Sequence, residues 1–237
     1  MSHATALLLA HADNSPVDTE FTSGPLSPND PFGQGRRTAF IDEQGIAAGV
    51  VLLSESLSVQ AYPYTEMLVV HRGTITLRSG DDSILLSVGE SAVIGRGTAL
   101  HIEAQPNSLW AFCAATQAAG PDKPGLTLID RCAQLTPSAP PEAGILIGPM
   151  PQCRSNNLFE DTASSLRIGV WDSTPYERFA RPHKIHELMH LIEGSVELHL
   201  ENGPTLNVKP GDSVFVAQGV PCKWTSKVYV RKFYAVT

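Results

Sequence analysis

The sequence predicts an all-β protein built from two copies of one domain. Two observations support this prediction. The 19 glycines and 18 prolines of the 237-residue chain fall between short runs rich in Val, Ile, Leu and aromatic residues, which is the pattern of strands and turns. The two halves also repeat at an offset of 120 to 122 residues. Helical periodicity is weak, and its two mild candidates, residues 2–12 and 111–119, fit a strand or a loop equally well.

The charge of the chain excludes several classes of partner. It carries 17 basic and 24 acidic residues, a net charge of −7, and residues 1–120 hold the whole acidic excess with five arginines and no lysine. There is no run of Lys and Arg that could neutralise phosphates or anchor the chain to an anionic membrane. We therefore expect neither a nucleic-acid nor a membrane partner. The hydrophobic fraction of 42% is sufficient for a folded core.

The first element is an N-terminal arm, residues 1–36. Its apolar stretch Ala6–Ala10 is far shorter than the ~20 residues that span a bilayer, and no basic segment precedes it, so it fits a first strand better than a signal peptide. The four cysteines are scattered without a C-x-x-C pair, which argues against a disulfide framework or a zinc ribbon. We therefore expect a cytoplasmic protein.

Two domains follow the arm. The first covers residues 37–118, the Pro/Gly-rich segment 119–160 is expected to be a linker, and the second domain covers residues 161–237. Strands are predicted for the first domain at residues 48–53, 67–70, 74–77, 83–88 and 109–114. In the second domain they are predicted at residues 166–171, 188–192, 196–200, 214–217 and 228–236.

The repeat rests on landmarks whose spacing is kept in both halves. Glu66 and Gly73 form an E-x6-G motif that returns as Glu187 and Gly194. Further correspondences join Gly89 with Gly211, Gly97 with Gly219, Gly49 with Gly169, and Phe112 with Phe233. A slowly drifting offset of this kind indicates the internal duplication of a domain of ~100 residues.

These motifs resemble those of the cupin superfamily. The second half contains Arg181-x-His183-x3-Glu187-x6-Gly194, followed by Gly211-x7-Gly219-x2-Cys222. Its last segments, 221–224 and 230–234, are similar to the subfamily that includes ethanolamine-utilisation cupins. The resemblance implies two tandem cupin barrels with the double-stranded β-helix, or jelly-roll, fold. Tandem cupins also include (S)-ureidoglycine aminohydrolase, a manganese enzyme.

The second half departs from the metal-binding motif of catalytic cupins. His183 and Glu187 match the family's ligand positions, whereas Arg181 and Cys222 stand where histidines are usual. A set of His183, Glu187 and Cys222 is chemically able to hold one divalent ion, Zn, Fe or Mn, and a thiolate favours the first two. The fixed charge of Arg181 opposes a cation. The alternative is a metal-free pocket in which Glu187 pairs with Arg181 or another inward cation.

The first half retains only the glutamate of this motif. Gln60, Tyr62 and Leu100 stand at the other three positions, and His101 is one residue out of register, which turns its side chain to the other face. We therefore expect the N-terminal barrel to be structural or to hold an organic ligand, with Glu66 and Tyr62 as the candidate ligand-binding residues.

Other side chains have a structural and a functional interpretation. Trp171, Trp224 and Phe233 are expected to line the second barrel, with core packing as the default role and a flat organic ligand as the alternative. His186 and His190 lie on the strand face opposite Glu187, so we expect them to contact the other barrel or a second subunit rather than a metal. Cys222 is expected to be a buried thiol rather than a nucleophile.

The residues as a whole favour a protein that binds a small polar or anionic metabolite in its C-terminal barrel, with or without a divalent metal. Ionisable residues are dense there, and Arg181 could clamp a carboxylate with paired hydrogen bonds. The alternatives are a metal-free sensing or assembly module and a metal-dependent aminohydrolase, and the sequence leaves open whether the protein is an enzyme. We expect a homodimer because outer sheet edges need covering.

Overall fold

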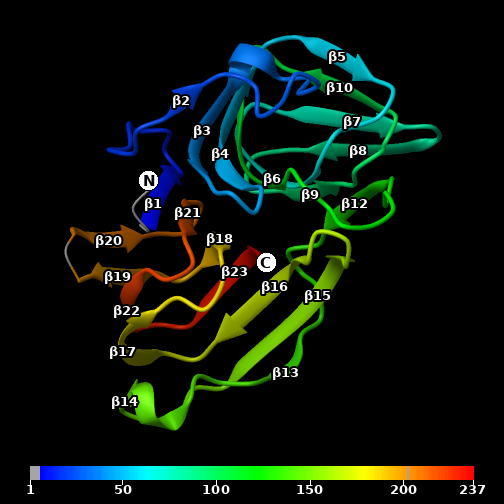
Figure 1. Ribbon diagram of the computed structural model, residues 1–237. Helices are drawn as coiled ribbons and strands as arrows, with labels where there is room; N and C mark the ends of the chain where they lie inside the picture. The colour runs from blue at the N-terminus through cyan, green and yellow to red at the C-terminus, as the bar shows by residue number, and fades with distance from the viewer. Residues whose placement is uncertain (1–5, 202) are drawn as a thin grey trace.

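The computed structural model describes residues 6–201 and 203–237, and this part of the chain is built almost wholly of strands (Figure 1). It contains 23 strands and two short 3-10 turns, Gly33–Gly35 and Ala143–Ile145. The strands form four sheets, which make two barrels. This confirms the predicted all-β fold. No helix within the described ranges is long and apolar enough to cross a membrane.

The N-terminal barrel consists of a seven-stranded and a four-stranded sheet. The larger sheet has the order β12-β9-β6-β11-β4-β3-β2. Its strands are β2 (Thr22–Ser23), β3 (Arg36–Ile41), β4 (Ile46–Leu53), β6 (Thr65–Arg72), β9 (Ser91–Ile94), β11 (Ser108–Ala115) and β12 (Leu126–Ile129). The smaller sheet has the order β5-β10-β7-β8, with β5 (Ser56–Val59), β7 (Ile75–Ser79), β8 (Asp82–Leu86) and β10 (Leu100–Ala104).

The C-terminal barrel consists of a seven-stranded and a five-stranded sheet. The larger has the order β1-β21-β18-β23-β16-β15-β13, with β1 (Ala6–Ala10), β13 (Thr136–Ser138), β15 (Cys153–Asp161), β16 (Leu166–Ser173), β18 (Glu187–Glu193), β21 (Ser213–Val216) and β23 (Val230–Val236). The smaller has the order β14-β17-β22-β19-β20, with β14 (Leu146–Ile147), β17 (Tyr176–Pro182), β19 (Val196–Leu200), β20 (Thr205–Val208) and β22 (Pro221–Ser226). All ten predicted strands are present, with ends shifted by at most two residues.

Both barrels include strands from outside the two expected domains. β1, from the expected N-terminal arm, pairs with β21 of the C-terminal barrel. β12, from the expected linker, pairs with β9 of the N-terminal barrel. The same segment of the chain, residues 119–160, also supplies β13, β14 and most of β15 to the C-terminal barrel. Arm and linker are therefore structural parts of the barrels, because the open edges of β9 and β21 need hydrogen-bond partners.

The strand registers refine the alignment of the two halves. Leu68 and Gly49 flank Phe112 in the first barrel, whereas the corresponding Met189 and Gly169 flank Tyr234 in the second. The expected match of Phe112 with Phe233 was therefore wrong by one residue. The second copy has one additional residue between β18 and β21, so all later positions correspond at an offset of 122.

The large sheets of the two barrels share a hydrophobic core. Its members come from both barrels, and the rings of Phe40 and Phe215 meet across it at 4.8 Å. His186 Nε2 lies 3.0 Å from an oxygen of Asp42 in the other barrel. Ser213 Oγ lies 3.0 Å from His190 Nδ1 and 2.7 Å from His71 Nε2, so this hydroxyl joins the barrels. The predicted barrel-to-barrel role of His186 and His190 is confirmed.

Candidate functional site

The centre of the C-terminal barrel is an ion pair between two neighbouring strands. Residues 187, 189 and 191 of β18 point to one face because side chains alternate along a strand. Lys232 of β23 reaches along this face and donates a hydrogen bond from Nζ to Glu187 Oε1 at 2.8 Å. The same Nζ lies 3.0 Å from Met189 Sδ. Glu187 thus pairs with an inward cation, as the metal-free alternative required, but that cation is Lys232 and not Arg181.

His183 completes the contacts of the glutamate. It lies between β17 and β18, and its Nε2 is 3.0 Å from Glu187 Oε2, so both carboxylate oxygens of Glu187 are engaged. Burial by itself would raise the pKa of Glu187, but the charges and hydrogen bonds of Lys232 and His183 lower it to about 2. Glu187 is therefore ionised throughout the physiological pH range.

Two tryptophans enclose the lysine ammonium. Lys232 Nζ lies 4.8 Å from the ring centroid of Trp171 and 5.2 Å from that of Trp224. The two indoles meet edge to face at 6.2 Å, and Tyr176 stacks on Trp224 at 5.5 Å. Aromatic faces attract a desolvated cation by about 2 kcal/mol. We call Glu187, Trp171 and Trp224 the cation cage, and Lys232 fills it.

Phe233 has a different position from that predicted. Its ring stacks on His190 at 5.9 Å, on the sheet face opposite Lys232, and belongs to the core shared by the barrels. The prediction that Phe233 lines the barrel was wrong because the one-residue offset turns it outward. The residue that shares the inner face with Lys232 is Tyr234.

Cys222 is buried beside the cage and behaves as an inert thiol. Its Sγ lies 3.5 Å from the carbonyl oxygen of Lys223. Burial raises the pKa of Cys222, and the nearby charge of Arg178 only partly opposes this shift. Because the thiolate is the nucleophile and the metal ligand, a raised pKa disfavours both functions.

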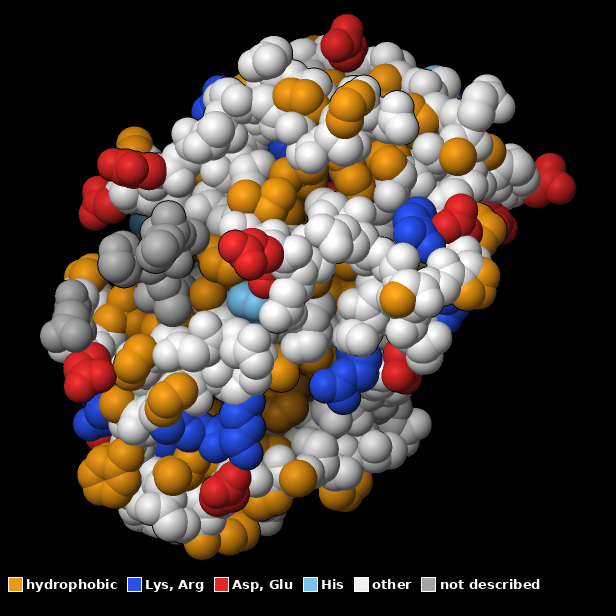
Figure 2. All heavy atoms as spheres, viewed as in Figure 1, with side chains coloured by type: hydrophobic (Ala, Val, Ile, Leu, Met, Phe, Trp, Pro, Cys, Tyr) orange, Lys and Arg blue, Asp and Glu red, His pale blue; other side chains and the backbone are white. Residues whose placement is uncertain are grey.

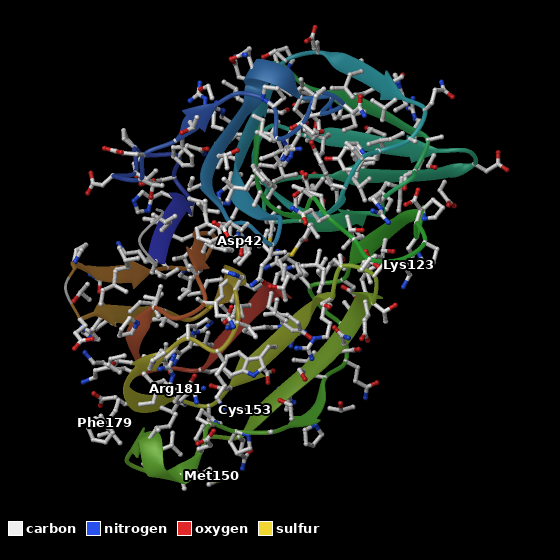
Figure 3. The ribbon with its side chains drawn as sticks, viewed as in Figure 1. Asp42, Lys123, Met150, Cys153, Phe179 and Arg181 are labelled. Atoms are coloured by element: carbon white, nitrogen blue, oxygen red, sulfur yellow. The ribbon has the colours of Figure 1, made fainter. Side chains whose placement is uncertain are left out.

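Arg181 lies at the mouth of the barrel rather than at its centre. Its strand partner is Cys222, and its Nη1 is 3.8 Å from Glu142 Oε1. Lys184 Nζ lies 2.8 Å from the same Glu142 oxygen. Figure 3 places Arg181 in the lower barrel together with the exposed Phe179, and Lys and Arg side chains gather on this barrel in Figure 2. The side chain of Arg181 is 28% exposed and open to a solute.

The expected metal ligands do not fit a metal ion in this arrangement. His183 and Glu187 are adjacent, but the lysine ammonium already occupies the free carboxylate oxygen, and the Cys222 thiol is protonated. Throughout residues 6–201 and 203–237, no group of three or more His, Cys, Asp and Glu side chains is placed to hold a metal. A divalent ion would have to displace Lys232 against direct charge repulsion.

The N-terminal barrel contains a comparable but sealed ion cluster. Arg36 of β3 contacts Glu66 through Nη2 at 2.9 Å and Asp30 through Nε at 2.6 Å. Tyr62 donates to Glu66 Oε2 at 2.9 Å, and the Arg36 guanidinium stacks over the ring of Phe112 at 4.3 Å. Burial would lower the pKa of Arg36, but Glu66, Tyr62 and Asp30 together raise it.

Both candidate ligand-binding residues of this barrel are therefore occupied by the chain itself. The side chains of Arg36, Glu66 and Asp30 have no exposed surface, and Tyr62 has none either. His101, as predicted, faces away from the cluster and contacts Ser58 and Glu103. In this structure the N-terminal barrel does not open its glutamate to solvent.

Sequence reasoning missed the two cations that define these sites, Arg36 and Lys232. Each is a charged residue within a strand; the other residues of β23 are largely buried, whereas in β3 only Phe40 is buried besides Arg36. That pattern is a usable signal, because a charge at an inward strand position requires a buried counter-ion. It does not identify the counter-ion, since Arg36 and Glu66 lie 30 residues apart and Lys232 and Glu187 lie 45 apart.

The tandem barrels, each with its glutamate at the start of an equivalent inner strand, define a double cupin. The family model of the EutQ-like cupin domain matches residues 161–234. A protein of unknown function from Pseudomonas syringae pv. tomato, described as a member of the DUF861 family, has a crystal structure that is 72% identical to this chain. The two superpose with a TM-score of 0.98 over 99% of this chain and 100% of that one. The chain therefore belongs to the DUF861 family of cupins.

More distant structures share the fold alone. A cupin 2 conserved barrel domain protein from Leptotrichia buccalis is 12% identical, with a TM-score of 0.58 over 84% of this chain and 86% of that one. AerE from Microcystis aeruginosa is 13% identical, with a TM-score of 0.50 over 92% of this chain and 99% of that one. No protein with a curated description matches the chain.

Proposed function

We propose that this double cupin binds a small anionic metabolite at the mouth of its C-terminal barrel and does so without a divalent metal. The observation that carries the proposal is the position of Lys232, whose ammonium binds the Glu187 oxygen that a metal ion would need. The ionised Glu187 and the Lys232 ammonium together carry no net charge. The charges left to attract a ligand are therefore those at the mouth.

The mouth has an excess of positive charge. Arg181 and Lys184 share the single carboxylate of Glu142, and His183 contacts Glu187. The planar guanidinium of Arg181 is suited to a carboxylate, which it binds with two parallel hydrogen bonds. A small organic acid with one or two carboxylates matches this arrangement in charge and in hydrogen-bonding capacity.

The site favours a binding module over an enzyme. Hydrolysis by a metal-bound hydroxide needs an open metal site, and the ammonium of Lys232 opposes one. Burial raises the pKa of Cys222, and the amino group of Lys232 is engaged by Glu187 and two indole faces, so neither is free to act as a nucleophile. No contact in the site favours the aminohydrolase alternative.

A thermal-shift screen tests the proposal. Protein stripped with a chelator is heated with organic acids, sugars and ureido compounds, each with and without Mn, Fe, Zn or Ni. We expect organic acids to raise the melting temperature equally with and without metal. A shift that appears only with a metal, together with a stoichiometric metal in the purified protein, would contradict the proposal.

Two variants locate the binding site in the same screen. Arg181→Ala should abolish most of the stabilisation by organic acids, because it removes the main carboxylate donor. The matched control is Arg78→Ala, which removes a surface arginine of the N-terminal barrel that pairs with Glu103. An equal loss in both variants would indicate a nonspecific charge effect rather than a site.

A further inference from the structure

One carboxylate of the chain itself already lies where a ligand carboxylate would bind. Glu142 Oε1 lies 2.8 Å from Lys184 Nζ and 3.8 Å from Arg181 Nη1. The hydrogen bond and charge of Lys184, with the charge of Arg181, lower the pKa of Glu142. Glu142 is therefore an anion held by the exposed Lys184 and the half-buried Arg181.

Glu142 lies on a short segment with few attachments to the barrel. We call residues 139–147 the mouth strap. It contains the 3-10 turn Ala143–Ile145 and β14, which pairs with only Arg178 and Glu177 of β17. The side chain of Glu142 is 68% exposed, and ion pairs that are this exposed are weak. The contact can therefore open at low energetic cost.

The mouth strap contains two prolines and is followed by a glycine. Pro140 and Pro141 precede Glu142 and restrict the backbone there. Gly148 follows β14 with a φ of +96°, a conformation that other residues rarely adopt. A shift of the strap would carry Glu142 away from Arg181 without disturbing the inner strands β18 and β23.

We propose that Glu142 is a tethered competitor for the anion that the C-terminal barrel binds. In the ligand-free protein its carboxylate contacts Lys184 and Arg181, and a small carboxylate ligand displaces it. The mouth strap then moves outward. The inference rests on the proposed function and names a carboxylate as the group of the ligand that binds. It also explains how the affinity for the ligand is set, since the ligand must compete with Glu142.

Calorimetric titration with acetate, oxalate and malonate, at low ionic strength, tests the competition. Glu142→Gln keeps the size of the side chain and removes its charge. Because an exposed ion pair is weak, we expect malonate to bind this variant about two- to fivefold more tightly than the wild type. The neutral analogue malonamide should show no such gain.

The matched control is Glu177→Gln. Glu177 lies on β17, four residues before Arg181, and its side chain pairs with Lys223 at 2.5 Å and not with Arg181 or Lys184. Its loss should leave malonate affinity unchanged. An equal gain in both variants, or no gain in Glu142→Gln, would overturn the competitor role. Weaker binding by Glu142→Gln would do so too, because it would mean that Glu142 assists the ligand.

Amide hydrogen exchange provides a second readout on the wild type. Displacement of Glu142 should increase exchange in a peptide covering the mouth strap when malonate is added, and leave β18 unchanged. Unchanged or slower exchange in the strap, with malonate bound, would contradict displacement. If no carboxylate binds the wild type or either variant, it is the proposed function that fails, so the two failures are distinguishable.

Discussion

The two barrels keep the same internal geometry but complete it with cations from different strands. Tyr62 and His183 occupy equivalent positions, since each makes the same pair of backbone hydrogen bonds, to Thr98 and Gly97 in one barrel and to Val220 and Gly219 in the other. Each side chain also contacts the glutamate four residues later, at 2.9 Å from Tyr62 and 3.0 Å from His183.

The cations of the two copies stand at positions that are not equivalent. Strand registers equate Lys232 with Trp110, and Arg36 with Ser155. The N-terminal barrel therefore takes its cation from β3, and the C-terminal barrel takes it from β23. The glutamate is therefore the feature that both copies keep. Its charge can be neutralised by a basic residue from any strand that places the residue beside it.

The copies also differ in access to solvent. The side chain of Glu66 is fully buried, whereas that of Glu187 is 13% exposed and borders the mouth. A fully buried ion pair can contribute to the stability and specificity of the fold, but a ligand cannot reach it. The accessible pair in the C-terminal barrel is the one that can take part in binding. Substitutions of Arg36 and Lys232 test this contrast, and a third measurement concerns the histidines between the barrels.

The largest effect is expected from the sealed cluster. Arg36→Met leaves Glu66 and Asp30 buried without their counter-ion, and breaking a buried pair costs about 3–5 kcal/mol of unfolding free energy. Urea denaturation at pH 7 measures the loss. Arg37→Met, at the exposed neighbouring position, is the control and should cost well under half of that. Equal losses would show that the cluster has no special role in stability.

The interface between the barrels should respond to acid. Burial lowers the pKa of His71 to about 4, while His11 and Asp212 oppose this shift, and burial also lowers that of His190. Between pH 6.5 and 4 the unfolded chain therefore binds a proton at His71 that the folded chain does not. Stability is full above pH 6.5 and falls by about 3 kcal/mol as the pH drops to 4.

The contribution of His71 is isolated by a variant. His71→Gln keeps a hydrogen-bonding group toward Ser213 but cannot titrate, so the fall in unfolding free energy between pH 6.5 and 4 should be smaller than in the wild type. The same change at the half-exposed His199 serves as the control. If the unfolding free energy of His71→Gln depended on pH as it does in the wild type, His71 would not be the cause of that dependence.

The accessible pair should contribute less than the sealed one. Lys232→Met leaves Glu187 with His183 alone, and we expect a loss of about 2 kcal/mol at pH 7. The pKa of Glu187, about 2 in the folded protein, makes the pair stabilising above pH 4.5, and this contribution is lost as the pH falls from 4.5 to 2. Lys232→Met should flatten that part of the pH profile.

The control for this pair is Lys227→Met, which removes an exposed lysine that contacts Glu197. Its unfolding free energy and pH profile should match those of the wild type. A loss in Lys232→Met that equals or exceeds the loss in Arg36→Met would contradict the ordering of the two barrels, and with it the link between burial and energetic weight.

Local sequence patterns were enough to predict the fold class, the duplication and the position of the glutamates. Strand patterns and turn glycines are local, so the ten strands could be predicted directly. Because His186 and His190 lie on the strand face opposite Glu187, their contact with the other barrel could be predicted too. The regular E-x6-G spacing then fixed Glu66 and Glu187 as equivalent residues.

The counter-ions of those glutamates, and the sheet edges that β1 and β12 join, could be seen only in the folded protein. Arg36 and Lys232 reach their partners across strands far apart in sequence, and nothing local distinguishes an inward base from an exposed one. The pairing of β1 and β12 with distant edges is likewise a property of the assembled sheets. Local patterns determine elements, whereas buried charge pairing and edge closure depend on which elements meet.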